Sequence, residues 1–195
     1  MQLKPLILAS GSPRRKQLLA QIGIEFSVIQ SDIDEDFSLS LPPEAFTEHW
    51  AREKAKNVGE KNPDSLIVGA DTVVVLNGKI LGKPKDETTS FSMLRSLSGK
   101  THEVITGVSF FSMEPQIDVT FNERTFVSFK TLIDSDIHYY IDNYQPNDKA
   151  GSYGIQDWFS VHISKIDGCY FNVMGLPLSS FFAQYRRLSK SHEES

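Results

Sequence analysis

Two arginines follow the expected start of a helix, where positive side chains are unfavourable. In "ASGSPRRKQLL", residues 9–19, Ser12 and Pro13 predict an N-cap and a first helical position, and Arg14 and Arg15 come next. A cation in this turn opposes the helix dipole by roughly 0.3–1 kcal/mol. The stretch therefore predicts an anion-binding turn suited to phosphate, with a solvated basic turn as the alternative.

An aspartate interrupts a run of residues that otherwise predicts a buried strand. Asp71 stands inside "SLIVGADTVVVL", residues 65–76, where a carboxylate is costly to bury. We expect a functional carboxylate, as metal ligand or general base, and the alternative is a strand-end aspartate bonded to a turn. Gly69 shares its face of the strand, so some other group is expected to approach the backbone there, and Thr72 points to the opposite face.

Two lysines are candidates to meet that carboxylate. Lys54 falls near the middle of the apolar face of a helix predicted over residues 43–61. Its ammonium either reaches a cleft or snorkels to solvent, and the pattern favours neither. Lys83 follows a hairpin predicted at Asn77-Gly78, which would return it toward Asp71; the alternative is an exposed loop lysine.

Two loops carry weaker signals. The acidic run "DIDED", residues 32–36, is either a solvated loop or a source of a ligand for a hard cation, through Glu35 or Asp34. The loop over residues 145–156 ends in Gln156, whose amide is suited to reading the edge of a base. A plain connecting loop is the alternative there.

Composition limits the class of protein. The chain has 195 residues, 39% of them hydrophobic, which is enough for one domain or for two small lobes. A net charge of −5 argues against a nucleic-acid-binding protein, and the apolar run near the N-terminus is too short for a membrane span. The single cysteine, Cys169, is expected in a strand and indicates a cytoplasmic setting. The five histidines lack metal-ligand spacing.

The expected elements alternate between crossover units and hairpins. The predicted fold class is therefore α/β, a mixed twisted sheet with flanking helices. Strands are expected at 6–9, 25–31, 65–76, 79–84, 103–111 and 123–132, with a last hairpin over 159–173. Helices are expected at 13–22, 43–61, 86–99, 135–144 and 176–188, and residues 190–195 as a disordered tail.

Six segments together resemble the Maf family of nucleoside triphosphate pyrophosphatases. They occur in the family's order between residues 6 and 178. The resemblance implies two lobes of a single domain around a central cleft, as in the inosine triphosphate pyrophosphatases, and a divalent cation, Mg²⁺ or Mn²⁺. It also implies a homodimer and a link to septum formation. The segments are "LILASGSPRRKQLL", "AREKA", "VGADTVVVLNGKILGKPKD", "LSGKTHEVITGV", "DKAGSYGIQ" and "NVMGLPL".

The resemblance assigns roles to the residues that stand out physically. It implies that Asp71 is the catalytic carboxylate and a metal ligand and that Glu35 lies beside the metal. The implied phosphate-binding residues are Ser10, Arg14, Arg15, Lys54 and Lys83.

The implied substrate depends on three positions where subgroups of the family differ. Arg14, Thr72 and Gln156 resemble the subgroup that acts on dTTP and UTP. The sister subgroup, which acts on N7-methyl-GTP, carries a Phe-Glu-type ending in place of the tyrosine and glutamine here. The chain departs from many members at Asp157-Trp158, where they have glycines. A non-catalytic nucleotide-binding regulator of septum formation is the alternative of another class.

Overall fold

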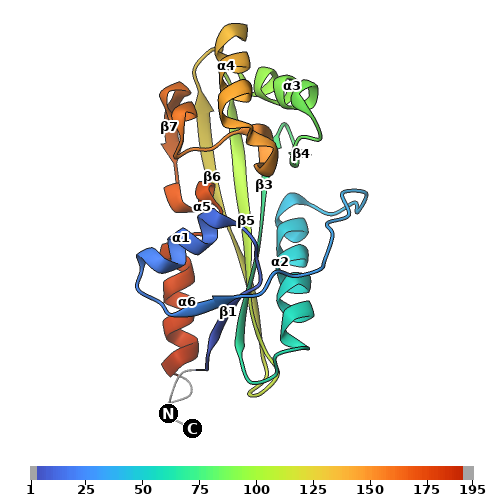
Figure 1. The fold of residues 1–195 in the computed structure, drawn as a ribbon, viewed down its shortest axis with the longest axis vertical. Coiled ribbons are helices and arrows are strands. Elements are labelled where there is room, and N and C mark those ends of the chain that lie inside the picture. Colours follow the sequence, from blue (N-terminus) through green and yellow to red (C-terminus); the bar gives the residue numbers. More distant parts are fainter. Residues whose placement is uncertain (1–3, 191–195) are drawn as a thin grey trace. The chain divides into compact units, whose positions relative to one another are not determined.

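The computed structural model describes residues 4–190, and the predicted tail beyond Lys190 lies outside them. The fold is mixed α/β, as predicted. A seven-stranded sheet has the order β2-β1-β3-β5-β6-β7, with β4 also paired to β3. The strands are β1 (Leu6–Leu8), β2 (Phe26–Val28), β3 (Leu66–Leu76), β4 (Lys79–Leu81), β5 (Thr101–Ser112), β6 (Ile117–Phe129) and β7 (Ile163–Asp167) (Figure 1).

The helices follow the predicted ones closely, with one addition. They are α1 (Pro13–Gln21), α2 (Pro43–Gly59), α3 (Glu87–Leu97), α4 (Asp134–Tyr144), α5 (Tyr170–Met174) and α6 (Leu178–Lys190). Short 3₁₀ turns are η1 (Pro146–Asp148), η2 (Ala150–Ser152) and η3 (Trp158–His162). None of the helices within residues 4–190 combines the length and the apolar character that crossing a membrane requires.

The predicted hairpin over 159–173 is wrong in its second arm. Only β7 is a strand there, paired antiparallel with β6, and the residues after Gly168 form α5. The short apolar stretch at 170–174 fits a strand and a helical turn equally well, so its pattern could not decide between them. Cys169 accordingly lies in the connection before α5 and not in a strand.

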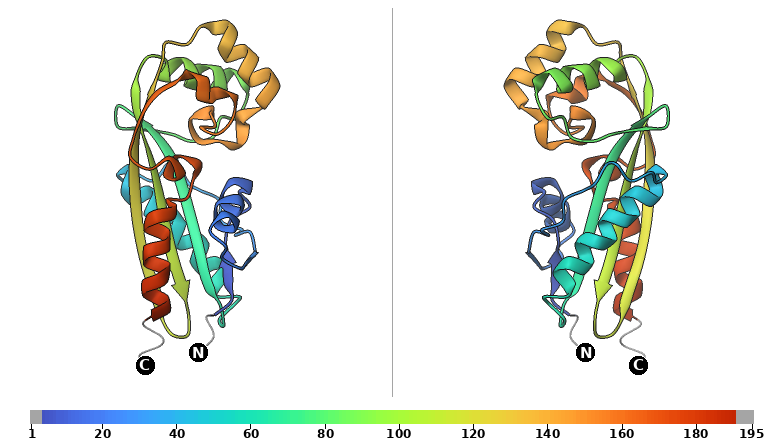
Figure 2. Two further views of the ribbon diagram at one scale, coloured as in Figure 1. Left: turned by 90° about the vertical axis from the view of Figure 1, so that its left-hand side faces the viewer. Right: turned by 90° about the vertical axis from the view of Figure 1, so that its right-hand side faces the viewer.

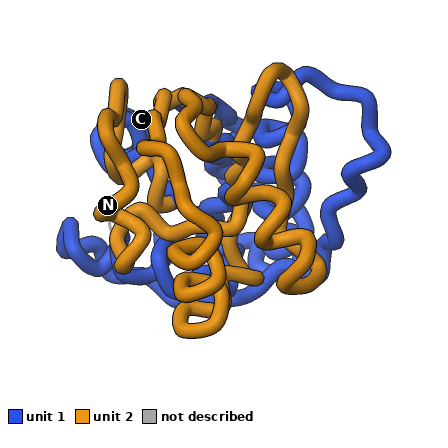
Figure 3. Tube along the Cα trace, turned by 90° about the horizontal axis from the view of Figure 1, so that it is seen from above, with its two compact units in different colours: residues 1–71, 106–123, 175–195 blue, residues 72–105, 124–174 orange. Residues whose placement is uncertain are grey.

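The chain divides into two compact units (Figure 3). The described part of unit 1 is residues 4–71, 106–123 and 175–190, and unit 2 is residues 72–105 and 124–174. Strands β3, β5 and β6 each contribute residues to both units.

Unit 1 has helices on both faces of its strands (Figure 2). Gly107 of β5 lies against the backbone of α2. Phe110, three positions along and therefore on the opposite face, stacks on Phe181 of α6 with ring centroids 5.2 Å apart. The parallel pairs of β1 with β2 and with β3 hold the start of the chain in this layer.

Unit 2 is built around a turn and a group of aromatic rings. Asn77 and Gly78 both have positive φ, 51° and 76°, as the two-residue hairpin between β3 and β4 requires. Helices α3 and α4 pack against each other, and α3 also contacts η2. Tyr140, Phe159 and Phe129 are buried in its interior.

Candidate functional site

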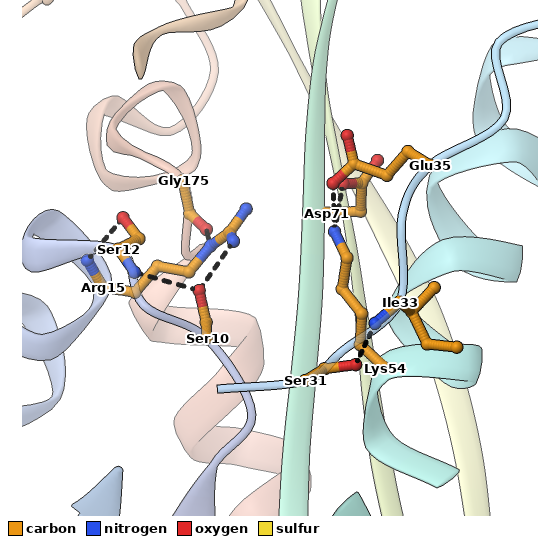
Figure 4. A network of polar contacts seen from close by, with 9 residues as sticks. All are labelled: Ser10, Ser12, Arg15, Ser31, Ile33, Glu35, Lys54, Asp71 and Gly175. Atoms are coloured by element: carbon orange, nitrogen blue, oxygen red, sulfur yellow. Dashed lines mark hydrogen bonds and ion pairs between the residues drawn. The ribbon is translucent and has the colours of Figure 1, made fainter. Parts of the chain in front are cut away.

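Lys54 joins the two carboxylates that the sequence singled out. Its Nζ donates to Asp71 Oδ1 at 2.8 Å and to Glu35 Oε1 at 2.5 Å (Figure 4). Lys54 is 8% exposed and Asp71 4% exposed, so the contact between them is buried. The two alternatives for Lys54 are thereby decided in favour of an inward-facing ammonium.

Glycines bring the helix that carries Lys54 close to the sheet. A Cβ on Gly69 would lie 2.1 Å from Ala51 O and 2.9 Å from Ala55 N, both in the backbone of α2. A Cβ on Gly107 would lie 2.4 Å from Thr47 O of the same helix. The approach predicted at Gly69 is therefore that of α2, and it places Lys54 beside Asp71, two residues further along β3.

The cluster contains two carboxylates and one ammonium, and burial shapes their titration. Burial raises the pKa of Asp71 above its ordinary value. The charge of Lys54 opposes that shift, whereas the charge of Glu35 adds to it. The pair of carboxylates thus favours a cation between them, which Lys54 supplies in this structure.

The acidic loop is held on α2 by an asparagine that the sequence analysis did not select. Asn57 Oδ1 accepts from Ser31 Oγ at 3.3 Å and from the backbone N–H of Asp32 at 3.2 Å. The Nζ of Lys61, beyond the end of α2, contacts Asp32 Oδ2 at 3.0 Å. These contacts fix the start of the segment that delivers Glu35 to Lys54.

The start of α1 has the predicted cap, with Pro13 at the first helical position and the two arginines after it. Ser12 is the N-cap, its Oγ accepting from the backbone N–H of Arg15 at 3.5 Å. The Arg15 side chain donates from Nη1 to Ser10 Oγ at 3.1 Å and from Nε to Gly175 O at 2.8 Å (Figure 4). Ser10 and Arg15 are thus brought together, and Arg14 lies beside them in the first turn.

The same turn is electrostatically coupled to the carboxylate cluster. Desolvation by burial lowers the pKa of Arg15, the charge of Asp71 raises it, and the charge of Arg14 lowers it. The first turn of α1, which is described in full, has no acidic residue. Unit 1 therefore holds six of the predicted site residues: Ser10, Arg14, Arg15, Glu35, Lys54 and Asp71.

The other three predicted residues belong to unit 2. Thr72 is half-buried, next to Asp71 in β3, and Lys83 is exposed just after β4. Gln156 is exposed in the turn after η2. The Gly151 N–H donates to Gly82 O at 3.0 Å, so the segments that carry Lys83 and Gln156 are bonded to each other.

The donor set fits a divalent cation completed by a ligand. Within residues 4–190, no group of three or more His, Cys, Asp or Glu side chains gathers to hold a metal ion by itself. Asp71 and Glu35 offer two carboxylates around one cation position. Mg²⁺ in nucleotide sites commonly takes one or two carboxylates and fills its shell with phosphate oxygens and water.

Two further residues that the sequence analysis missed support these segments. Gly107 had an available signal, since a glycine inside a strand pattern marks a close approach just as Gly69 does. Tyr140, which contacts the turn of Gln156 from α4, had none, because a tyrosine on the buried face of a helix is an ordinary core residue.

A mixed sheet, a basic helix start and a buried carboxylate–lysine cluster define an α/β protein with a buried charged site. The chain belongs to the Maf family, since residues 5–188 match the family described as Maf-like protein.

Relatives resemble the chain over nearly its whole length, and each is named dTTP/UTP pyrophosphatase. The one from Halalkalibacterium halodurans is 49% identical over 91% of this chain and 92% of its own. Those from Carboxydothermus hydrogenoformans and Bacillus cereus are 44% and 43% identical, over 93% and 96% of this chain and 97% and 91% of their own.

Proposed function

We propose that the protein is a nucleoside triphosphate pyrophosphatase that hydrolyses dTTP and UTP to the monophosphate and pyrophosphate. The observation that carries the reaction is the buried contact of Lys54 with Asp71 and Glu35 beside the basic turn of α1. The choice of dTTP and UTP is supported by the names of relatives up to 49% identical to this chain.

In this proposal the cationic residues neutralise the phosphate chain. A nucleoside triphosphate brings about four negative charges, and its cleavage depends on positioning and charge neutralisation. Arg14 and Arg15 bind phosphate oxygens together with the N–H groups at the start of α1, and Ser10 orients the Arg15 guanidinium. Lys54 and Lys83 are the two lysines assigned to the same chain of phosphates.

Asp71 and Glu35 are the proposed ligands of a divalent cation, Mg²⁺ or Mn²⁺. Held by these two carboxylates, the ion would supply positive charge that polarises the scissile phosphoanhydride and offsets charge on the leaving pyrophosphate. Lys54 already occupies the position between the two carboxylates, so loading the site requires its ammonium to turn toward phosphate oxygens.

Asp71 also orients the attacking water and accepts its proton in this proposal. Burial raises the pKa of Asp71, and a more basic carboxylate is a better proton acceptor near neutral pH. The water oxygen bonds to the α-phosphorus as the bond between that phosphorus and the oxygen bridging to the β-phosphate breaks. The electron pair of the broken bond leaves with pyrophosphate.

The base is recognised by Gln156, whose amide offers both a donor and an acceptor to the O4 and N3 atoms of uracil or thymine. Thr72 and Arg14 are the other proposed determinants of selectivity. All three positions are assigned from the family resemblance, and the exposed place of Gln156 in its turn is compatible with contact to a ligand.

The proposed setting is the cytoplasm, with a homodimer as the working form and no nucleic-acid or membrane partner. One cysteine and a net charge of −5 support this setting. A link to septum formation is part of the same proposal. Light scattering of the purified protein measures the mass, and a monomer at micromolar concentration would contradict the dimer.

A panel of nucleotides tests the reaction and its substrate together. Pyrophosphate release is measured with dTTP, UTP, CTP, GTP and N7-methyl-GTP, each with Mg²⁺, with Mn²⁺ and with a chelator. We expect metal-dependent release that is fastest with dTTP and UTP. Preference for N7-methyl-GTP would indicate the sister activity, and binding without hydrolysis would indicate a regulator.

A further inference from the structure

The turn that carries Gln156 is bonded to one buried tyrosine of α4. Tyr140 is fully buried, and its hydroxyl oxygen accepts from the backbone N–H of Gly154 at 2.9 Å. The same hydroxyl donates to Asp157 Oδ2 at 2.9 Å. One hydroxyl therefore holds residues on both sides of Gln156.

The Asp157 side chain continues this connection. Its other oxygen, Oδ1, accepts from the backbone N–H of Phe159 at 3.0 Å. A Cβ on Gly154 would lie 2.2 Å from Asp157 Oδ2, so the absence of a side chain at Gly154 is what lets the carboxylate reach Tyr140. The turn is thus closed by side-chain contacts within itself and to α4.

The Tyr140 ring is itself fixed by other aromatic rings. It stacks on Trp158 with ring centroids 6.1 Å apart and packs on Phe159 with centroids 4.9 Å apart. Ile155, directly before Gln156, is buried, whereas Gln156 is exposed. Among residues 154–157, Gln156 is the one whose side chain faces outward from a segment that is otherwise held.

A glutamine amide needs such support to discriminate between pyrimidines. In one orientation it matches the O4 and N3–H of uracil, and turned by half a rotation it matches the N4 amine and N3 of cytosine. Because the two matches differ by a rotation of the amide, a turn held in one conformation is a requirement for selectivity: a turn free to move would let the amide adopt either orientation at the base.

We propose that Tyr140 is a positioning residue for base selection, acting through its bonds to Gly154 and Asp157 to fix the turn of Gln156. This inference rests on the proposed function and deepens it. Asp157, through its hydrogen bond, and Trp158, through its ring, are the residues after Gln156 that contact Tyr140.

The test compares kcat/KM for UTP with kcat/KM for CTP in the full chain. In Tyr140→Phe the ring and its stacking remain and only the hydroxyl is lost. We expect the UTP-to-CTP ratio to fall about tenfold, the effect of about 1.4 kcal/mol of differential binding. Tyr144→Phe removes a hydroxyl one turn along α4 and should leave the ratio unchanged.

Two further variants break the same connection from the other side. Asp157→Ala removes the carboxylate, and Gly154→Ala places a Cβ where Asp157 Oδ2 lies. Each should lower the ratio. The double variant Tyr140→Phe with Asp157→Ala should show less than the sum of the two single effects, because both substitutions remove the same bond between Tyr140 and Asp157.

The outcomes separate a positioning role from a structural one. A purely structural role lowers the folded fraction and thus kcat for both nucleotides equally, leaving the ratio unchanged; thermal unfolding of each variant measures that fraction. An unchanged ratio in any of the three folded variants overturns the inference. If the wild-type chain hydrolyses neither UTP nor dTTP, the proposed function fails and the inference fails with it.

Discussion

At the scale of single residues, the site centres on Lys54, Asp71 and Glu35. An ammonium on the apolar face of a helix and a carboxylate inside an apolar strand are each unfavourable alone. Their contact at 2.8 Å compensates both. Removing the charge of Lys54 takes from buried Asp71 its hydrogen-bonded cation, and removing the charge of Asp71 leaves Lys54 with Glu35 alone, so substitutions here are expected to act on activity and on titration together.

The first prediction concerns Asp71. Asp71→Asn keeps the size of the side chain, and the contact of Lys54 with Glu35 remains, so the fold is expected to persist. Pyrophosphate release should fall about 100-fold or more, since the amide neither accepts the water proton nor binds a cation as a carboxylate does. Unfolding by heat checks the fold, and near-normal turnover would remove Asp71 from the mechanism.

The second prediction concerns the pH dependence set by Lys54. The charge of Lys54 lowers the pKa of Asp71, opposing the effect of burial. Lys54→Met should therefore raise that pKa, and the acid limb of kcat/KM, which needs the ionised carboxylate, should move to higher pH. Lys56→Met, on the same helix, is the matched control. A limb that stays in place would show that Asp71 does not govern it.

At the scale of elements, the close contact of α2 with the strands brings the cluster together. Ala51 and Ala55 of α2 meet Gly69, and Thr47 meets Gly107. Small residues on both elements let the backbones touch, and Lys54 reaches Asp71 as a result. The distance between α2 and the strands therefore determines whether Lys54 can contact Asp71.

The third prediction uses Gly69→Ala to test whether the distance between α2 and β3 determines this contact. The added Cβ would overlap the backbone of α2, which can yield only by moving away from β3. We expect a loss of about 1–3 kcal/mol in unfolding free energy and a higher KM for nucleotide. Both are measured on the purified variant, by urea unfolding and by pyrophosphate release.

Gly59→Ala provides the comparison. Gly59 is the last residue of α2, away from Lys54, and a Cβ added there would meet the side chain of Phe111. Stability should fall while KM stays constant. Equal changes of KM in the two variants would argue against the spacing of α2 and β3 as the cause.

How far the sequence predicted these elements depends on local signals. The start of α1 was predictable because serine is favoured at an N-cap and proline at the first helical position, where Ser12 and Pro13 lie. The hairpin was predictable because an Asn-Gly pair favours the positive φ angles that such a turn requires, and Asn77 and Gly78 have them. Residues 170–174 have no such signal, and their helix was missed. Lys54 was identifiable as an exception to its surroundings, whereas Asn57 and Tyr140 act through contacts between distant segments that a sequence does not display.

At the scale of the whole molecule, the two units differ in what they hold. Unit 1 contains the carboxylate–lysine cluster and the basic turn, and unit 2 contains Thr72, Lys83 and Gln156. Asp71 and Thr72 are consecutive in β3, so the division of the chain falls between them. In the proposed function, unit 1 supplies the carboxylates and most of the phosphate-binding cations, and unit 2 supplies Lys83 and two of the three residues assigned to the choice of base, Thr72 and Gln156.

The fourth prediction concerns global stability and a buried histidine. His102 is 2% exposed, its Nε2 is 2.8 Å from the Tyr153 hydroxyl, and burial lowers its pKa to about 4. The unfolded chain therefore binds a proton between pH 6.5 and 4 that the folded chain does not, so stability falls as pH falls through this range. The loss is about 3 kcal/mol.

Urea unfolding at pH 7 and pH 4 of the wild type and of His102→Gln checks this prediction. Glutamine does not titrate, so the variant should lose about 3 kcal/mol less on acidification. Parallel losses in the two proteins would show that other groups cause the acid sensitivity.

Unit 1 is formed by three separate segments of the chain, which are synthesised at different times. Its last stretch brings α6, whose Phe181 is fully buried against Phe110 of β5. At about 5–20 residues per second, roughly 3–15 s pass between the emergence of β5 and that of α6. During this interval Phe110 lacks the ring that covers it in the folded chain, so slower synthesis lengthens the time for which this apolar side chain is uncovered.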